Sequence, residues 1–484
     1  MPLCALLSLV LQVAAPRPAL HFVSPELQIR IGKPFEAALH NLLDINTVPY
    51  DAKVYNQTEL MKGGRFIRAG GGYDQPWTRD AAINSWNAAS LLAPDLARDT
   101  LWAATRPGER GEPIVQRDNQ WWDKVIWIVG AWSHYRVTGD RVFLTTAYGV
   151  ADRLLREMRA ARFDAKFGLF QGPSFFNDGI AGYPSPPAAA DDGGSSFVLD
   201  HPGTDRIMAL STNCVYVGAY EAAAAMAKEL KQPYEGWSQR AGELLSSINH
   251  HFWMQDRGTY GYLLDPAGKL DPSQEGCGLA FAVLFDVADP VRSRTLLEKA
   301  HVEPYGVVDV YPHFPRFSDA RPGRHNAIVW PMVQGMWARA AVKVHDLGSF
   351  QTQTETLAGL VSGSDGHFFE IYNAKSGKQD GGWQNGHQWG SAPDQTWSAT
   401  AFLSMVTNGL FGLRFEPGGL RLEPTLPGGW SGVALSGIRY RAATLDITLR
   451  GRGTKLRTLV LDGMKVKVVP ATLTGHHSLV AEVG

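Results

Sequence analysis

Helical periodicity dominates the chain from about residue 38 to about residue 411. Apolar residues recur there at the spacing of one helix face, and Gly-, Pro- and Trp-rich loops separate the runs. Thr78, Ser211 and Asp394 stand at the start of such runs, where N-cap residues are expected. The predicted helices include residues 79–92, 125–137, 141–161, 211–230, 236–252, 326–344 and 394–407.

The pattern changes after Phe411. Segments such as ALSGIRYRAATLDITLRG alternate apolar and polar residues and are broken by Gly and Pro, which predicts strands. Before that point only residues 258–264 and 306–310 show short strand-like pieces. The sequence therefore predicts a mainly α protein, a toroid of helical hairpins in residues 21–411. A small antiparallel, β-sandwich-like domain is expected in residues 412–484.

The N-terminus reads MPLCALLSLVLQVAAPRPAL. Its apolar run from Leu3 to Ala15 has the length of a signal-peptide core, and Ala14-Ala15-Pro16 offers small residues for cleavage, although no Lys or Arg precedes it. The run is too short to span a bilayer as a helix. We expect residues 1–20 to be a signal peptide and the protein to be exported to the periplasm or the medium.

Composition narrows the ligand class. The 484 residues carry 46 Lys+Arg against 47 Asp+Glu, a net charge of −1, which argues against nucleic acid and against a membrane surface. The 15 Trp favour a carbohydrate ligand, because exposed Trp commonly lines a binding site. Cys214 and Cys277 have no metal-type spacing, and whether they pair stays open. No cofactor is implied. A structural calcium stays open, although no carboxylate loop with calcium-ligand spacing argues for it.

Residues 366–400 carry the clearest functional signal. Here one carboxylate, Glu370, stands among aromatic, imidazole and amide side chains. Aromatic rings stack on the apolar faces of a sugar ring, and polar groups bond its hydroxyls. A core loop would have little use for so many polar groups, since each would need a buried partner. The sugar-binding candidates of this segment are Trp383, His387, Trp389 and Trp397.

A second candidate segment is GGGYDQPWTRDAAINSW, residues 70–86. Tyr73, Trp77, Arg79 and Asp80 lie where a Gly-rich loop enters a helix. Adjacent Arg and Asp can bind two neighbouring sugar hydroxyls, one as donor and one as acceptor. The alternative is an Asp that only favours the helix dipole.

A third segment, residues 116–132, places Asn119 and Gln120 before the pair Trp121 and Trp122. Polar residues ahead of paired Trp are typical of a subsite wall. The alternative is a helix cap followed by two core tryptophans.

Asp178 lies in the loop GLFQGPSFFNDGIAGYPSP, residues 168–186, directly after two Phe and Asn177. Aromatic surroundings remove solvent from a carboxyl, which raises its pKa and suits a general acid. The alternative is an ordinary Asp-Gly turn. Glycosidases need two carboxyls across the scissile bond, and a ring of hairpins would bring Asp178 and Glu370 together. His313 and Trp330 complete the candidate sugar ligands.

The chain resembles six-hairpin, (α/α)₆-barrel glycoside hydrolases over about residues 30–411. PWTRDAAI is similar to a sugar-binding element of glucoamylases. FFEIYNAKSG followed by APDQTWSATAFL resembles the general-base region of family 63 α-glucosidases and mannosylglycerate hydrolases. The resemblance implies that Glu370 is the base and that Trp77, Arg79 and Asp80 line the subsite of the cleaved sugar.

The resemblance leaves the acid open. Family 63 enzymes have a Glu just before the acidic Asp in a Trp-rich motif, and FFNDGIAGYP does not. Asp118 and Asp123 therefore stay as alternatives to Asp178. The expected activity is an inverting exo-glycosidase acting on an α-linked glucosyl or related hexosyl terminus. The alternatives are an α-L-rhamnosidase, a disaccharide phosphorylase, a lyase or epimerase, and a non-catalytic sugar-binding protein.

Overall fold

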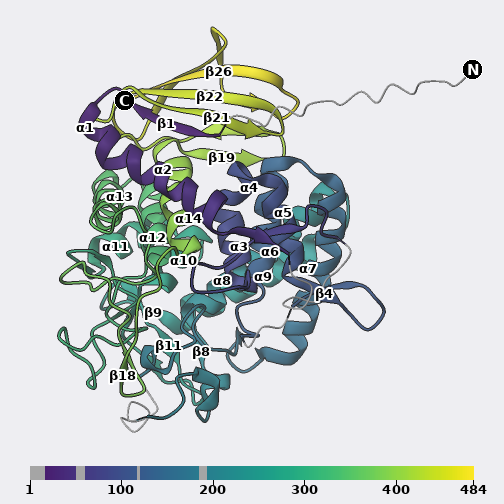
Figure 1. Cartoon of the computed structure of the whole chain (residues 1–484). Helices are drawn as coiled ribbons and strands as arrows, with labels where there is room; N and C mark the ends of the chain where they lie inside the picture. The colour runs from purple at the N-terminus through teal and green to yellow at the C-terminus, as the bar shows by residue number, and fades with distance from the viewer. Residues whose placement is uncertain (1–16, 51–59, 117–119, 185–192) are drawn as a thin grey trace, which may run out of the picture.

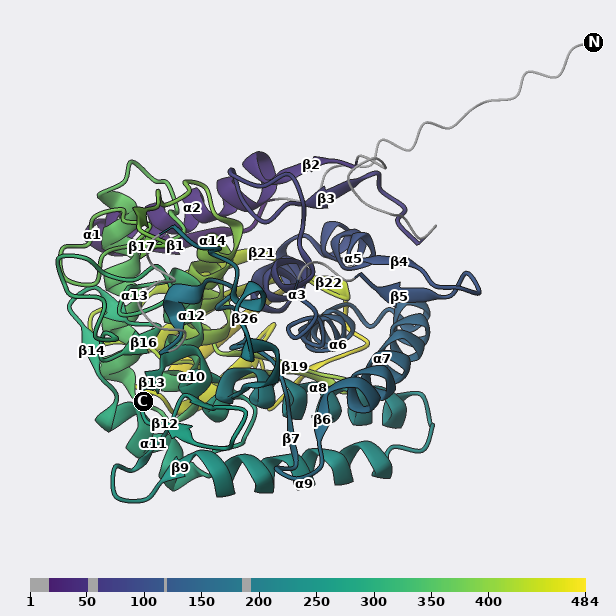
Figure 2. The same ribbon diagram turned by 90° about the horizontal axis from the view of Figure 1, so that it is seen from below.

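Six helices form a closed inner ring in this computed structural model, which describes residues 17–50, 60–116, 120–184 and 193–484. Each inner helix packs against the next, and the last returns to the first. Figure 1 shows the whole chain, and Figure 2 views the ring from below. The inner helices are α3 (Thr78–Asn84), α6 (Ile126–Thr138), α8 (Leu210–Glu229), α10 (Gly276–Leu284), α12 (Pro331–Lys343) and α14 (Thr396–Ser404).

A second set of helices packs outside this ring, and most of them contact an inner helix adjacent in the chain. The first outer helix, α2 (Lys33–His40), packs instead against the last inner helix, α14. The architecture is thus the predicted toroid of helical hairpins. The outer helices are α2 (Lys33–His40), α5 (Pro94–Ala103), α7 (Arg141–Arg162), α9 (Glu235–Phe252), α11 (Pro290–Lys299) and α13 (Leu347–Ser362). Shorter helical segments are α1 (Pro25–Leu27), η1 (Gln28–Gly32), η2 (Asn41–Ile45), η3 (Ser85–Ala89), α4 (Ser90–Leu92) and η8 (Met405–Leu410).

Burial explains the two rings. The inner helices α10 and α14 are buried on every face, whereas the outer helix α7 buries one apolar stripe and exposes its charged face. The uniformly apolar α10 has no helical periodicity, so it could not be predicted as the others were. Small residues allow close approach: a Cβ on Gly130 would lie 2.9 Å from the backbone of Ala82, where α6 meets α3.

The predicted N-cap residues are wrong, although α3 and α8 start within one residue of the prediction. Thr78 is the first residue of α3, and Ser211 is the second residue of α8. Asp394 precedes α14 without capping it, and Asp394 Oδ1 contacts His367 Nδ1 at 2.8 Å instead. The predicted helix 326–344 begins only at Pro331, since proline favours the first turn and restricts the residue before it.

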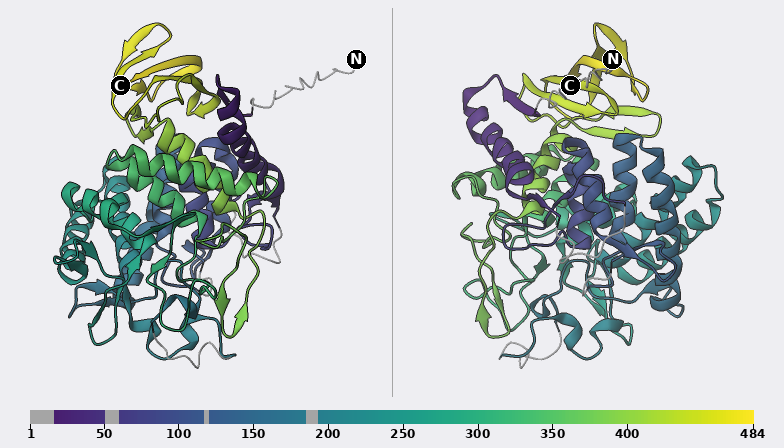
Figure 3. Two further views of the ribbon diagram at one scale, coloured as in Figure 1. Left: turned by 90° about the vertical axis from the view of Figure 1, so that its left-hand side faces the viewer. Right: turned by 45° about the vertical axis from the view of Figure 1, so that its right-hand side comes forward.

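Short strand pairs connect the helices, chiefly in loops at the end of the ring away from the C-terminal sheet (Figure 3). They are β2 (Thr47–Pro49) with β3 (Arg65–Ile67), β4 (Thr105–Pro107) with β5 (Pro113–Val115), β6 (Phe163–Asp164) with β7 (Leu169–Phe170), β9 (Trp253–Met254) with β10 (Thr259–Tyr260), β13 (Gln274–Glu275) with β16 (Val310–Tyr311), β14 (Val302–Glu303) with β15 (Gly306–Val307), β17 (Trp383–Gln384) with β18 (His387–Gln388), and the triplet β8 (Met208–Ala209), β11 (Leu263–Leu264) and β12 (Leu270–Asp271).

Two sheets follow the helices and lie over one end of the ring (Figure 3). The three-stranded sheet has the order β19 (Leu413–Glu416), β20 (Gly419–Leu422), β25 (Val469–Pro470). The six-stranded sheet has the order β1 (Ala19–Phe22), β21 (Val433–Tyr440), β22 (Ala442–Gly451), β26 (Thr474–Val483), β23 (Leu456–Leu461), β24 (Met464–Val466). Pairing is antiparallel except between β22 and β26, which run parallel.

The N-terminal strand β1 pairs with β21, so Ala19 and Leu20 take part in the C-terminal sheet. Residues 1–16, which hold the predicted signal-peptide core and Cys4, lie outside the described residues. Export therefore stays a prediction. Among the residues that the structure describes, no helix is both long and apolar enough to cross a membrane.

The contact between α3 and α6 gives a stability test. Gly130→Ala should lower the unfolding free energy by about 1–3 kcal/mol, because its new methyl would overlap the Ala82 backbone. Gly149→Ala in α7 is the matched control: nothing lies within 4 Å of its Cβ position, and better helix propensity should stabilise the protein by up to about 1 kcal/mol. Denaturant unfolding measures both. Equal effects would contradict the close packing.

Candidate active site

A pocket of about 140 Å³ lies at the N-terminal ends of the inner helices. Residues at or before the starts of α3, α6, α8, α12 and α14 contribute to it. Segments far apart in sequence therefore converge on one small space, as the toroid requires. Its lining consists of Ala69, Tyr73, Trp77, Arg79, Asp80, Gln120, Asp123, Phe176, Asp178, Arg324, His325, Trp330, Glu370, Gln395 and Trp397.

Glu370 is held by two donors on opposite oxygens of its carboxylate. Tyr73 donates its hydroxyl to Oε1 at 3.0 Å, and Arg324 Nη2 donates to Oε2 at 2.8 Å. Arg324 Nη1 also donates to the Gly381 carbonyl at 3.0 Å, which fixes the guanidinium. Burial and the Glu370 charge raise the pKa of Tyr73, so the phenol stays a donor. Glu370 itself is only 4% exposed.

Asp178 faces a different set of partners. Gln120 Nε2 donates to its Oδ2 at 2.5 Å, and Arg79 Nη2 lies 3.8 Å from the same oxygen. His325 Nε2 lies 3.3 Å from Oδ1. The Asp178 side chain is 31% exposed, so it combines fixed partners with access to the pocket.

The expected direction of the Asp178 pKa shift is wrong. Burial raises this pKa, as the neighbouring phenylalanines suggested, but the hydrogen bond and charge of His325 and the charges of Arg79 and Arg324 outweigh burial. The net pKa lies below the usual range. Sequence reasoning missed this because Arg324 and His325 lie about 150 residues further along the chain. Asp178 is therefore ionised in this pocket at neutral pH.

Arg79 is the centre of the remaining charge network. Its Nη1 lies 3.3 Å from Asp123 Oδ2, and its Nε lies 3.9 Å from Asp80 Oδ2. Burial lowers the pKa of Arg79, but Asp123, Asp178 and Asp80 together raise it further, so the guanidinium stays charged. The Asp123 and Asp80 side chains are only 3% and 4% exposed. All three carboxylates line the pocket, and Asp178, at 31%, is the most exposed of them.

Trp77 precedes α3 with a backbone φ of 43°. A bulky side chain rarely adopts this left-handed conformation, and such strain often marks a functional site. The turn places Trp77 on the pocket wall and starts α3 so that Arg79 and Asp80 point into it.

Nine of the predicted site residues line the pocket: Tyr73, Trp77, Arg79, Asp80, Gln120, Asp178, Trp330, Glu370 and Trp397. Asn119 and Asp118 lie outside the described residues.

The paired tryptophans, Trp121 and Trp122, lie in the core and do not form a subsite wall. This agrees with the alternative interpretation of two core tryptophans. Trp122 is fully buried and donates its indole N–H to the Ser174 carbonyl at 2.9 Å. Trp121 packs under the Arg162 guanidinium, 3.6 Å from its ring centre. Asn177 is also buried and donates to the Tyr262 hydroxyl at 3.0 Å. These side chains support the pocket from behind.

The remaining candidates lie away from the pocket lining. Trp383 and His387 belong to the β17–β18 hairpin. Trp389 is 41% exposed, and its ring lies 5.5 Å from the Arg324 guanidinium. His313 Nε2 contacts Asp319 Oδ1 at 2.9 Å. Trp389, which directly follows the hairpin, therefore lies one arginine away from Glu370.

Arg324, His325, Phe176 and Gln395 line the pocket but were not predicted to. The Arg-His pair stands in the Gly- and Pro-bounded run RPGRHNAIVWP, just before a helix. The Trp-x-Arg-Asp segment at the start of α3 likewise stands where a Gly-rich loop enters a helix. This shared position was the sequence signal that could have identified Arg324 and His325 as pocket residues. Within the described part of the chain, no group of three or more His, Cys, Asp and Glu has metal-site geometry. Cys214 and Cys277 are buried free thiols, and burial raises the pKa of both.

Comparison with known proteins identifies the family. The model of the mannosylglycerate hydrolase MGH1-like glycoside hydrolase domain matches residues 73–398, a span that begins and ends at the pocket. The chain belongs to this family. The glycosyl hydrolase family 65 C-terminal domain matches residues 413–469. No curated protein matches the sequence.

Solved structures share the fold of this glycoside hydrolase. A sialidase superposes with a TM-score of 0.64 at 15% identity. The superposition covers 88% of this chain but 37% of the sialidase, so this chain spans little more than a third of the length of the sialidase. The family 63 mannosylglycerate hydrolase of Thermus thermophilus, in complex with glucose, gives 0.55 at 15% identity over 77% and 99%. A family 78 rhamnosidase of Bacillus sp. GL1 gives 0.51 at 13% identity over 96% and 44%.

A buried polar cluster supports the Asp178 loop of the hydrolase. Glu275, at the start of α10, is fully buried and accepts hydrogen bonds from the Ser174 and Ser211 hydroxyls and from the Ser211 N–H. The Tyr183 hydroxyl donates to the Asn177 carbonyl at 2.6 Å. Burial raises the pKa of Glu275 to about 7, against the hydrogen bonds from Ser174 and Ser211, which lower it.

Glu275 therefore gives a pH-dependent stability. Its folded pKa of about 7 exceeds the unfolded value of 4.5, so its contribution is full below pH 4.5 and is lost as pH rises through 7. Glu275→Gln imitates the protonated acid. Relative to the wild type it should gain unfolding free energy between pH 5 and pH 8, on the order of 3 kcal/mol. Denaturant unfolding at several pH values tests this.

The control for that experiment is Glu298→Gln, which removes an exposed carboxyl on α11. If the unfolding free energies of Glu275→Gln and of the wild type differ by the same amount from pH 4 to pH 8, as is expected for the control, Glu275 does not titrate in this range.

Proposed function

We propose that this glycoside hydrolase removes one terminal sugar, an α-linked glucosyl or related hexosyl unit, with inversion of configuration. The observation that carries the proposal is that two carboxyls from different loops, Asp178 and Glu370, line one small pocket with arginines and tryptophans. Its volume of about 140 Å³ is close to the ~150 Å³ cavity known to hold one benzene ring. Space for a single ring favours action at a chain end.

Glu370 is proposed as the general base. An inverting base must be an oriented carboxylate that takes a proton from the attacking water. Tyr73 and Arg324 each donate to one oxygen of Glu370, so the carboxylate cannot rotate freely. A catalytic water would use a remaining lone pair of the same group.

Asp178 is proposed as the general acid. Its exposure of 31%, against 3% for Asp123 and 4% for Asp80, gives it the access that a glycosidic oxygen requires. The free pocket holds Asp178 ionised, so the carboxylate has to take up a proton from solvent as substrate binds. A bound sugar excludes water from Asp178, and this desolvation raises its pKa toward the acid form.

The other pocket residues are proposed to recognise the sugar. Gln120 and the Arg79–Asp80 pair offer donors and acceptors for neighbouring hydroxyls, and Trp77, Trp330 and Trp397 offer apolar faces. The glucose complex of the Thermus enzyme supports a hexosyl ligand for this fold. Export of the protein is proposed from its apolar N-terminus.

Leaving-group dependence separates the two roles. Asp178→Asn should lower kcat/KM by roughly 10²–10⁴ on a natural glucoside, but by less than about 10 on a dinitrophenyl glucoside, whose leaving group needs no protonation. Glu370→Gln should lose activity on both substrates, since water activation is still required. Steady-state kinetics on matched substrates, with Asp256→Asn as a surface control, measures this.

Other outcomes of the same kinetics would contradict the proposal. If the dinitrophenyl glucoside restored the activity of Glu370→Gln but not that of Asp178→Asn, Glu370 would be the acid and Asp178 the base. Release of rhamnose in place of hexose would favour the rhamnosidase alternative. Sugar binding without turnover of any substrate would indicate a carbohydrate-binding protein.

A further inference from the structure

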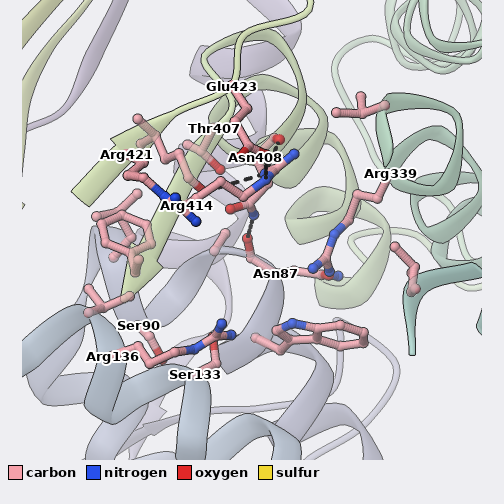
Figure 4. Close-up of a pocket in the computed structure, with 18 of the residues that line it drawn as sticks. Asn87, Ser90, Ser133, Arg136, Arg339, Thr407, Asn408, Arg414, Arg421 and Glu423 are labelled. Atoms are coloured by element: carbon pink, nitrogen blue, oxygen red, sulfur yellow. Dashed lines mark hydrogen bonds and ion pairs between the residues drawn. The ribbon is translucent and has the colours of Figure 1, made fainter. Parts of the chain in front are cut away.

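A second cavity, of about 490 Å³, lies at the other end of the inner ring, where β19 and β20 cover the helix ends. We call it the junction cavity. It is lined from the α3–α4 segment, the ends of α6 and α12, η8, and the strands of the C-terminal domain. Figure 4 shows its side chains, with arginines from helices and from the sheet facing one another.

Three arginines define the junction cavity: Arg136 on α6, Arg339 on α12 and Arg414 on β19. Of these three, only Arg414 has an acidic partner among the described residues, Glu423 at 3.1 Å. In the same part of the chain, neither Arg136 nor Arg339 forms an ion pair with a carboxylate. Arg421, also in the lining, is paired with Glu416.

Buried donors in the cavity lack acceptors. Within the residues that the structure describes, the buried Nε of Arg136 and the buried Nδ2 of Asn87 have no hydrogen-bond partner. Arg339 Nη1 donates to Asn87 Oδ1 at 3.2 Å and leaves that amide nitrogen directed elsewhere. Buried polar groups normally find partners. These two donors therefore favour a ligand that carries acceptor oxygens.

Repulsion among the positive charges of Arg136, Arg339 and Arg414 also favours a bound anion. Burial lowers the pKa of Arg136 to about 10 and that of Arg339 to about 9, and the charge of Arg414 contributes to the lowering of both. The charge of Glu416 offsets part of this effect at Arg136. Partly buried like charges that have too few counterions are still costly. An anion bound between them would remove that cost.

Helix ends alone do not account for the cluster. Cations near helix C-termini are favoured by the helix dipole, and Arg136 lies in the last turn of α6. Yet of the three arginines only Arg414 donates to a helix-end carbonyl of the described chain, that of Asn408 at 2.7 Å. Arg339 instead lies over the Trp86 ring at 4.2 Å.

We propose that the junction cavity binds a phosphorylated monosaccharide, with its phosphoryl oxygens between Arg136, Arg339 and Arg414. Arginine suits this group because its fork of N–H donors matches phosphate oxygens. The volume lies within the 300–1,000 Å³ of typical small-ligand pockets and leaves room beyond the phosphoryl group. Hydroxyls and amides that suit a sugar also line it: Asn87, Ser90, Ser133, Thr407 and Asn408.

Calorimetry and thermal unfolding test the site with three probes: glucose 6-phosphate, inorganic phosphate and glucose. Glucose 6-phosphate should bind and raise the Tm by several degrees, with inorganic phosphate binding more weakly. Arg136→Gln/Arg339→Gln should weaken glucose 6-phosphate binding at least 10-fold. Glu370→Gln should keep that binding, which separates this site from the catalytic pocket and from the fate of the proposed function.

A matched variant controls for lost charge. Arg156→Gln/Arg450→Gln removes two arginines that are 63% and 60% exposed, and should bind like the wild type. Without ligand, Arg136→Gln alone should have a Tm equal to or above that of the wild type, because repulsion is relieved. The proposal is overturned if glucose 6-phosphate does not bind, or if inorganic phosphate binds more tightly than glucose 6-phosphate does. It is also overturned if Arg136→Gln/Arg339→Gln binds glucose 6-phosphate with the affinity of the wild type.

Discussion

Ion pairs between two buried arginines and the pocket carboxylates hold the pocket end of this hydrolase together. Arg79 faces Asp80, Asp123 and Asp178, and Arg324 faces Glu370. Breaking a buried pair by removing one partner leaves an uncompensated charge, which typically costs about 3–5 kcal/mol. The same contacts orient the carboxylates, so stability and catalytic geometry depend on one set of interactions.

The ring makes this convergence possible and creates two unlike ends. Residues at or before the starts of five inner helices, α3, α6, α8, α12 and α14, line the pocket, so unpaired helix N–H groups gather at that end of the ring. Their C-terminal ends meet the strands of the second domain, and there the junction cavity gathers arginines from both domains. A single helical scaffold thus carries the proposed sugar site at one end and the proposed phosphate site at the other.

Sequence patterns predicted the toroid, the C-terminal sheets and most of the pocket, because these depend on periodicity and on local motifs. The Trp-x-Arg-Asp segment and Glu370 were recognisable in short windows. The direction of the Asp178 pKa shift was not, since it depends on Arg324 and His325 from a distant loop. Trp121 and Trp122 were wrongly predicted to line the sugar site, because the polar residues before them suit such a site. Both side chains are buried in the core, which a short window of sequence does not show.

The stereochemistry of the released sugar tests the central claim most directly. A panel of α- and β-linked glucosides, mannosides and rhamnosides would be hydrolysed and followed by NMR from the first turnover. An α-linked hexoside should release one terminal sugar as its β-anomer, because water attacks the face opposite the bond that breaks. First release of the α-anomer would mean retention and would contradict the assignment of Asp178 and Glu370 as an inverting acid and base.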